Sequence, residues 1–163
     1  LGIIRSHYVG RTFIEPSQTI RQFGVKLKHS VNRSCIEDKK VILIDDSIVR
    51  GTTASKIVKM VYEAGAKEVH LGISCPPIKH PDFYGIDTPN YNELIASKSN
   101  IEEMTELVGA KSLFFLSLDG TYKAMGYNER NKELPQFTDH CFTGDYPIDI
   151  SEILKINSYD ASR

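Results

Sequence analysis

Two adjacent carboxylates, Asp45 and Asp46, stand at the end of a run of four apolar residues, Val41–Ile44. A short, largely β-branched run that charged residues bound is typical of a strand buried on both faces of a parallel sheet. Open α/β sheets bind their ligands at the carboxyl ends of their strands. Because neighbouring carboxylates repel each other, sugar hydroxyls or a Mg²⁺ ion would relieve that repulsion. The pair therefore predicts a site for a polyhydroxylated ligand or for magnesium.

The residues that follow the acids have the composition of a phosphate-binding turn, and they are Ser47, Ile48, Val49, Arg50, Gly51, Thr52 and Thr53. They contain three hydroxyl groups and a glycine, which lets the backbone approach a ligand closely. A helix is predicted next, and its amino end would offer unpaired N–H groups and a positive dipole to an anion. The spacing suits a phosphorylated ribose, with its hydroxyls at the acids and its 5′-phosphate in the turn. The alternative is an ordinary strand-to-helix turn that Ser47 or Thr53 merely caps.

The elements around this turn form a βαβ unit. Apolar residues recur at helical spacing after the turn, at Ala54, Ile57, Val58, Val61 and Ala64. Gly65 stands where a left-handed residue would end that helix. The segment Glu68–Ser74 then reads as a second strand. Because the crossover contains a helix, the two strands are expected to be parallel and the crossover right-handed.

The rest of the chain is less regular. Residues 1–36 are predicted to be a long loop with some helix over 17–22, and 75–90 an irregular loop. Ser99 and Glu102 predict a capping box for a helix that ends at Gly109. A third strand over 113–118, a helical turn over 119–125 and an ordered tail are expected to follow. The predicted fold class is α/β, with a mainly parallel sheet.

Composition excludes several classes of protein. The chain has 163 residues, of which 40% are hydrophobic and 25% charged, which is typical of one globular domain. No apolar stretch approaches the length of a membrane span, so no membrane partner is expected. The net charge of −1 argues against a nucleic-acid partner, although residues 1–40 hold eight basic against three acidic residues, which favours a local anionic ligand. Three cysteines without close spacing predict neither a disulfide framework nor a zinc site, and favour a reducing, cytoplasmic location.

The motifs together resemble a known family. Residues 41–53 resemble the signature with which type I phosphoribosyltransferases bind phosphoribosyl pyrophosphate (PRPP). Three further segments resemble the amidophosphoribosyltransferase family, whose members use glutamine and open purine biosynthesis. These segments are Tyr8–Ile14 (YVGRTFI), His80–Asp87 (HPDFYGID) and Cys141–Pro147 (CFTGDYP). The resemblance extends over nearly the whole chain, and it implies a sheet of the type I phosphoribosyltransferase kind that is incomplete at its N-terminal side.

The resemblance implies a reaction and roles for residues. It implies phosphoribosyl transfer from PRPP to ammonia derived from glutamine, which gives 5-phosphoribosylamine and pyrophosphate. Asp45 and Asp46 would hold Mg²⁺ and the ribose hydroxyls, and 47–53 the 5′-phosphate. Residues from about 8 to 29 would form a flexible loop that closes over PRPP, with Arg11 and Lys28 facing the pyrophosphate. The implied cofactor is Mg²⁺, the implied regulators are purine nucleotides, and the implied assembly is a homo-oligomer.

The chain also departs from the family. Family members carry an N-terminal glutaminase domain with a cysteine nucleophile, whereas this chain starts at Leu1 and none of its cysteines matches. We therefore expect the chain to be a C-terminal fragment that is inactive alone, with ammonia supplied by the missing domain. Residues 1–125 are expected to form the phosphoribosyltransferase portion, and 126–163 a tail that packs on it. Some members hold an iron–sulfur cluster through cysteines, at positions that correspond here to Asp82, Pro135 and Thr138. These side chains cannot replace thiolates, so no iron–sulfur cluster is expected.

Three other interpretations fit part of the pattern. A salvage phosphoribosyltransferase on the same fold would need a hood that recognises a free base. A PRPP-sensing regulatory protein would need no catalytic loop but would want a DNA-binding module. A response-regulator receiver would need a phospho-accepting aspartate at a later strand end, followed by a lysine. Asp119 could be that aspartate, but no suitably placed lysine follows it.

Overall fold

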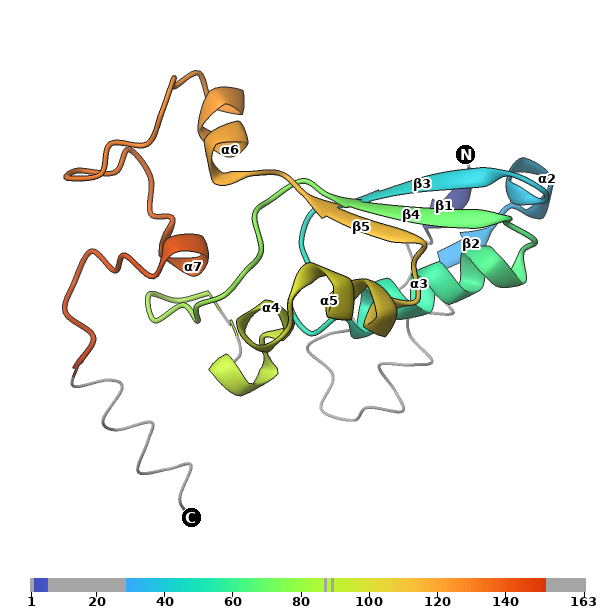
Figure 1. Cartoon of the computed structure of the whole chain (residues 1–163), viewed down its shortest axis with the longest axis horizontal. Helices are drawn as coiled ribbons and strands as arrows, with labels where there is room; N and C mark the ends of the chain where they lie inside the picture. The colour runs from blue at the N-terminus through green and yellow to red at the C-terminus, as the bar shows by residue number, and fades with distance from the viewer. Residues whose placement is uncertain (1, 6–28, 87, 89, 152–163) are drawn as a thin grey trace, which may run out of the picture.

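The computed structural model describes residues 2–5, 29–86, 88 and 90–151. Its centre is a three-stranded parallel sheet in the order β3 (Lys40–Asp45), β4 (Glu68–Ile73) and β5 (Ser112–Phe115) (Figure 1). The register places the last residue of β3, Asp45, beside Ile73 of β4. The predicted α/β class with parallel strands is confirmed, and so is the βαβ order around the turn.

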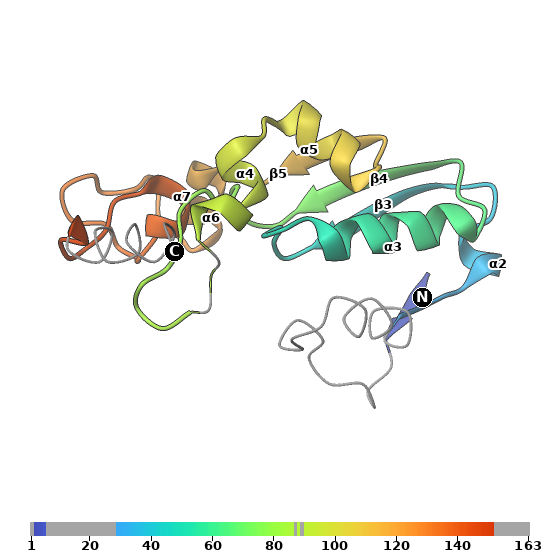
Figure 2. The same ribbon diagram turned by 90° about the horizontal axis from the view of Figure 1, so that it is seen from below.

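Two helices cover one face of this sheet, α3 (Thr52–Glu63) and α5 (Ile101–Val108) (Figures 1 and 2). Their apolar stripes pack on the strands in one hydrophobic core. The largest buried side chains of that core are Leu71, Met104, Val58, Val61, Val69 and Val108. Helix α3 ends as predicted, since Ala64 is its C-cap and the next residue, Gly65, has a left-handed φ of 96°.

The remaining elements are short and flank the sheet. They are β1 (Ile3–Arg5) paired antiparallel with β2 (His29–Val31), α2 (Arg33–Ile36), η1 (Tyr91–Glu93), α4 (Ile95–Lys98), α6 (Leu118–Ala124) and α7 (His140–Thr143). Figure 1 shows α6 and α7 beyond the carboxyl ends of the strands. The loop predicted over 1–36 therefore contains two strands and a helical turn, while the helix expected over 17–22 lies outside the described residues.

Strand β3 differs from its prediction, because it is not buried on both faces. Its side chains alternate, so that Val41 and Leu43 pack against the core whereas Ile42 and Ile44 are 67% and 66% exposed. On β5, Phe114 is also exposed. The reason is that α3 and α5 both lie on one side of the sheet (Figure 1), and within the described residues β3 is an edge strand.

Two predicted helix starts were wrong by one residue each. Helix α5 begins after Asn100, not Ser99: the Asn100 side chain accepts from the backbone N–H of Glu103, and the Glu103 side chain accepts from that of Asn100. Asparagine and serine cap a helix about equally well, so the sequence does not decide between them. Strand β5 is shorter than predicted because Ser117, whose Oγ accepts from the N–H of Gly120, starts α6.

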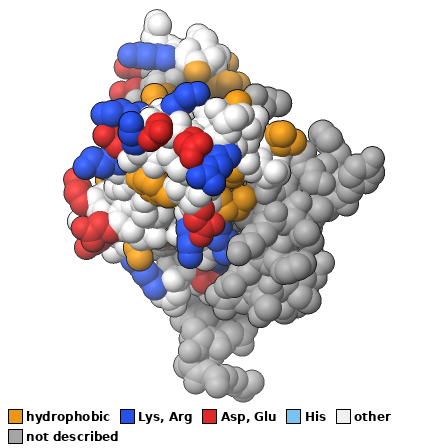
Figure 3. Space-filling model, turned by 90° about the vertical axis from the view of Figure 1, so that its right-hand side faces the viewer, with side chains coloured by type: hydrophobic (Ala, Val, Ile, Leu, Met, Phe, Trp, Pro, Cys, Tyr) orange, Lys and Arg blue, Asp and Glu red, His pale blue; other side chains and the backbone are white. Residues whose placement is uncertain are grey.

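The end of the sheet at which the strands begin carries charges of both signs (Figure 3). Basic side chains there pair with acids, as in Arg33–Glu37 and Lys40–Glu68. The described part of the basic N-terminal stretch is therefore a mixed surface and not a cationic patch. Among the described helices, none combines the length and the apolar character needed to cross a bilayer.

Candidate functional site

The acid pair lies where the sequence predicts it, at the carboxyl end of β3. Asp45 is half-buried and Asp46 exposed. Asp45 Oδ1 accepts from the N–H of Asp46 at 3.0 Å, and Asp46 Oδ1 accepts from Ser47 Oγ at 3.0 Å. The backbone of Asp45 is fixed from the neighbouring strand, because its carbonyl accepts from the N–H of Ser74 at 3.0 Å. The strand end is thus rigid, while Asp46 is turned to solvent.

The turn after the acids contains one buried apolar side chain, which anchors it, and one glycine, which adopts a left-handed backbone conformation. Ile48 is only 3% exposed and belongs to the hydrophobic core. Gly51 has a left-handed φ of 75° and is the N-cap of α3. Within the described residues no side chain caps this helix, so its first-turn N–H groups and the positive dipole end have the chemistry to hold an anion. Thr52 and Thr53 lie exposed in that first turn.

The structure therefore brings most of the predicted site residues together. The prediction for Ile48 needs correction, because its side chain is buried in the core. Only the backbone of Ile48 can contact a ligand. Arg50 points its guanidinium to Glu93 of η1, with which it forms an ion pair. This partner is 43 residues away in sequence, and no local pattern indicated it. Arg11 and Lys28 lie outside the described residues, as does most of the predicted loop over 8–29.

A cysteine completes the surroundings of the acids. Burial, and then the charges of Asp46 and Asp45, raise the pKa of Cys75 from 9.0 to about 11. The thiol therefore stays protonated near neutral pH. This thiol is half-buried. Its place near the acids follows from the topology, because Cys75 comes shortly after β4 and parallel strands end at one edge of a sheet.

The acid pair has the chemistry to hold magnesium. Mg²⁺ prefers oxygen ligands and is often bound through one or two carboxylates, with water and substrate phosphates completing its shell. Asp45 and Asp46 offer such oxygens at the edge of the site. A cavity of about 210 Å³ adjoins Asp45, but apart from this acid its lining is apolar, from Ile3, Leu43, Ile44, Ala54, Ile57 and Leu71. That cavity is unsuited to phosphate, so the helix end remains the better anion site.

A second group of potential metal ligands lies away from β3. Asp82, His140 and Cys141 each offer one ligand atom, and these atoms lie within 4.8 Å of one another. Asp82 is already engaged, since it accepts from the N–H groups of Tyr84 and Ile86 and pairs with His140 Nε2 at 2.8 Å. These hydrogen bonds outweigh the effect of burial and lower the pKa of Asp82. The arrangement joins the loop at 79–86 to α7 and serves packing.

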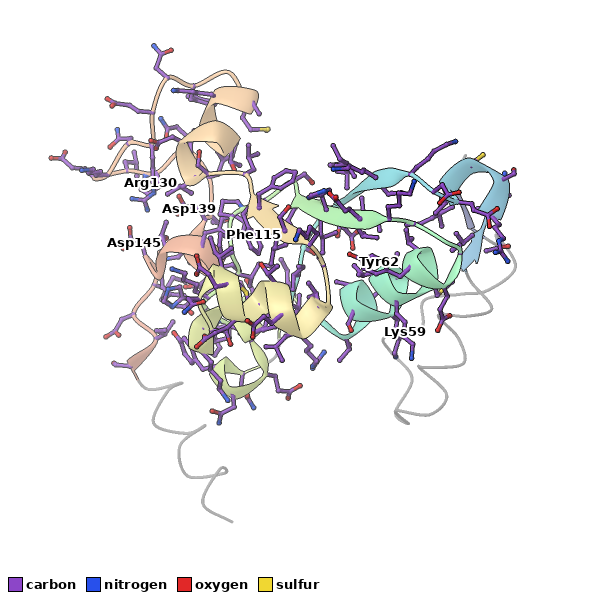
Figure 4. The ribbon with its side chains drawn as sticks, turned by 45° about the vertical axis from the view of Figure 1, so that its right-hand side comes forward. Lys59, Tyr62, Phe115, Arg130, Asp139 and Asp145 are labelled. Atoms are coloured by element: carbon purple, nitrogen blue, oxygen red, sulfur yellow. The ribbon has the colours of Figure 1, made fainter. Side chains whose placement is uncertain are left out.

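A third polar group surrounds Asp139, directly before α7. Asp139 accepts two hydrogen bonds from Arg130, at 2.6 and 3.1 Å, and one from Tyr122 Oη at 2.7 Å. Arg130 also reaches Asp145 at 2.7 Å. Figure 4 shows Arg130, Asp139 and Asp145 together at one end of the molecule, far from Lys59 and Tyr62 of α3. Every member is paired within the cluster, so it is a structural network.

Comparison with known proteins identifies the relatives. No protein-family model matches the chain. It is 63% identical over 147 residues to the amidophosphoribosyltransferase of Rhizobium etli, covering 90% of this chain and 30% of that protein. It is 52% identical over 150 residues to the Bacillus subtilis enzyme of the same name and 55% identical over 152 residues to a chloroplastic one of Arabidopsis thaliana.

Solved structures agree with the sequences. The glutamine PRPP amidotransferase of B. subtilis, complexed with ADP and GMP, superimposes with a TM-score of 0.78 at 51% identity, over 93% of this chain and 33% of that one. A structure described as the allosteric regulatory enzyme of purine biosynthesis gives a TM-score of 0.73 at 48% identity. The chain spans about a third of the length of these relatives. By these matches the chain belongs to the amidophosphoribosyltransferase family.

Proposed function

We propose that the chain forms the PRPP-binding part of an amidophosphoribosyltransferase. In the overall reaction, the bond between C1 of the ribose and pyrophosphate breaks, and a bond from C1 to ammonia nitrogen forms. Pyrophosphate leaves, the nitrogen loses a proton, and 5-phosphoribosylamine results. The observation that carries the proposal is the geometry of residues 45–53, in which two acids at a strand end are followed by a short turn and a helix whose N-cap, Gly51, has no side chain to occupy the first-turn N–H groups.

The proposed roles follow from the chemistry of each group. Asp45 and Asp46 accept hydrogen bonds from the ribose hydroxyls and would hold the magnesium ion. That ion supplies charge neutralisation to the pyrophosphate. The N–H groups at the start of α3, with the hydroxyls of Thr52 and Thr53, hold the 5′-phosphate. Arg11 and Lys28 are proposed to face the pyrophosphate, where cationic groups would stabilise the leaving group.

The proposal extends to compartment, domains and regulation. Three free cysteines suit a reducing cytoplasm, although several relatives are chloroplastic by name. Residues 1–125 would form the phosphoribosyltransferase portion and 126–163 a tail packed on it. A relative was solved with ADP and GMP, so we propose purine nucleotides as inhibitors and a homo-oligomer as the assembly; gel filtration and inhibition by GMP test both.

The decisive experiment uses a hybrid enzyme, in which this chain replaces the matching segment of the R. etli relative. We expect the hybrid to release pyrophosphate from PRPP when glutamine or ammonia is supplied. Asp45→Asn with Asp46→Asn should lower kcat/KM for PRPP by at least about 100-fold, since each acid acts where charge develops. Asp119→Asn, on the exposed start of α6, is the matched control and should leave activity unchanged.

The same assays separate the alternatives. An inactive hybrid beside an active parent enzyme would contradict the proposal, and so would full activity of the doubly substituted hybrid. Turnover of PRPP with a free purine or pyrimidine base would indicate a salvage enzyme. PRPP binding by calorimetry without any turnover in the hybrid would indicate a sensing protein.

A further inference from the structure

The turn at 48–51 is held in shape from outside by the short segment η1–α4, residues 91–98. The N–H of Ile95 donates to the carbonyl of Val49 at 3.0 Å. The guanidinium of Arg50 pairs with the carboxylate of Glu93. A Cβ at Gly51 would lie 3.1 Å from Cδ1 of Ile95. Three consecutive residues of the turn therefore each meet the same segment.

The segment is itself well fixed, so it can serve as a template. Leu94 is completely buried, and Ala96 is buried beside it. Ser97 Oγ donates to the carbonyls of Tyr91 and Leu94, at 2.7 and 2.8 Å. Asn90 caps the start of η1 by accepting from the N–H of Asn92. These bonds fix the conformation of the segment without help from the turn, and the buried side chains of Leu94 and Ala96 anchor it.

The contacts also decide which groups of the turn a ligand meets. In a trans peptide the carbonyl and the following N–H point to opposite sides. Since the carbonyl of Val49 points to Ile95, the N–H of Arg50 is directed away from α4. The ion pair with Glu93 meanwhile turns the Arg50 guanidinium toward η1 and neutralises it. A phosphate in this turn would therefore meet backbone amides, and not the charged side chain of Arg50.

We infer that Glu93 is a positioning residue for the phosphate turn, acting through Arg50 to hold the backbone of residues 49–51 in its binding shape. This inference rests on the proposed function, because it concerns the 5′-phosphate of PRPP. Both partners of the ion pair are about half exposed, at 45% and 47%. Pairs of this kind are weak and are screened by salt.

The test is Glu93→Gln in the hybrid enzyme, with Glu106→Gln on the exposed face of α5 as the matched control. At low ionic strength the KM for PRPP should rise about two- to fivefold, with kcat unchanged, because ground-state binding is what the turn supplies. At an ionic strength of about 0.5 M the difference should shrink toward that of the control. Glu106→Gln should leave KM unchanged under both conditions.

A double-substitution cycle with Arg50→Gln checks the route of the effect. If Glu93 acts through Arg50, Glu93→Gln should change KM little further in the Arg50→Gln background. An unchanged KM for Glu93→Gln, or equal effects of Glu93→Gln in both backgrounds, would overturn the inference. A lower kcat at unchanged KM with a clear loss of thermal stability would also overturn it, as that is a purely structural effect. An inactive unsubstituted hybrid would instead count against the proposed function itself.

Discussion

The acids of this molecule are used in two opposite ways. Asp139 lies directly before α7 and accepts hydrogen bonds from Arg130, Tyr122 and Thr143. Its side chain is only 6% exposed. Asp46 lies at the end of β3, is exposed, and accepts from its own neighbour, Ser47. Buried charges need full compensation, whereas exposed ones keep coordination for a ligand.

This difference teaches how to tell a structural acid from a binding one. Hydrogen bonds from Arg130 and Tyr122 outweigh burial and lower the pKa of Asp139, and the guanidinium in turn has a raised pKa. The hydrogen-bonding groups of these residues are therefore satisfied by one another within the fold. At the β3 end the surrounding support is applied to the backbone, through Ser74 and Ile95, while the carboxylate of Asp46 stays in contact with solvent.

The largest effect is expected when a buried acid loses its charge. Asp139→Asn leaves Arg130, which is 11% exposed, beside a neutral partner, so the free energy of unfolding should fall by about 3–5 kcal/mol. Asp145→Asn touches the same guanidinium, but Asp145 is 62% exposed, so its cost should stay below about 1 kcal/mol. Urea unfolding followed by tyrosine fluorescence, in a chain without tryptophan, measures both. Equal losses of stability in the two variants would contradict the distinction between a buried and an exposed acid.

A smaller loss is expected from the glycine of the turn. Gly51→Ala places a Cβ at a φ of 75° and 3.1 Å from Ile95, which should cost about 1–3 kcal/mol of folding stability and weaken binding of magnesium PRPP. Gly109→Ala is the control, because its φ is 73° but its new Cβ meets nothing within 4 Å. Unfolding and calorimetric titration would be compared for the two. A similar loss of PRPP binding in both would refute the role of the turn.

Low pH should decrease the folding stability that the buried acids Asp82 and Asp139 contribute. Hydrogen bonding outweighs burial at Asp82 and Asp139, so both folded pKa values lie below the ordinary 3.8. The stability they contribute is complete above pH of about 4 and is lost as pH falls through the lowered values, because the unfolded chain binds protons first. Asp82→Asn, which keeps an oxygen for the N–H groups of Tyr84 and Ile86, should flatten the decline. Urea unfolding at pH 2 to 5, as an approximate range, tests it; an unchanged decline would contradict it.

The smallest effect concerns Cys75. Since Asp46 contributes after burial to the raised pKa of this thiol, Asp46→Asn should lower that pKa from about 11 without restoring the ordinary value of 9.0. The pH dependence of alkylation by iodoacetamide reports the change, with Asp119→Asn as the control. If the profile did not move, the carboxylate would not lie near the thiol as the structure has it.

The sequence predicted the parallel βαβ core and the place of the acids, because both depend on local periodicity and on the rule that ligands bind at strand ends. It failed for β3, since a continuous apolar run does not reveal that only Val41 and Leu43 meet the core. It missed the pairing of β1 with β2, which are three residues each and far apart in sequence. The contact of Arg50 with Glu93 was equally hidden, because nothing in local spacing encodes it.

The bidentate contact between Arg130 and Asp139 also closes a loop at its base. The eight positions between them are mostly exposed, with Leu134 at 77%. Since the two ends are fixed by their own contacts, lengthening such a loop costs little entropy. Foreign sequence, such as an affinity tag or a fluorescent label, is therefore expected to be tolerated near Leu134 without loss of the Arg130–Asp139 contact.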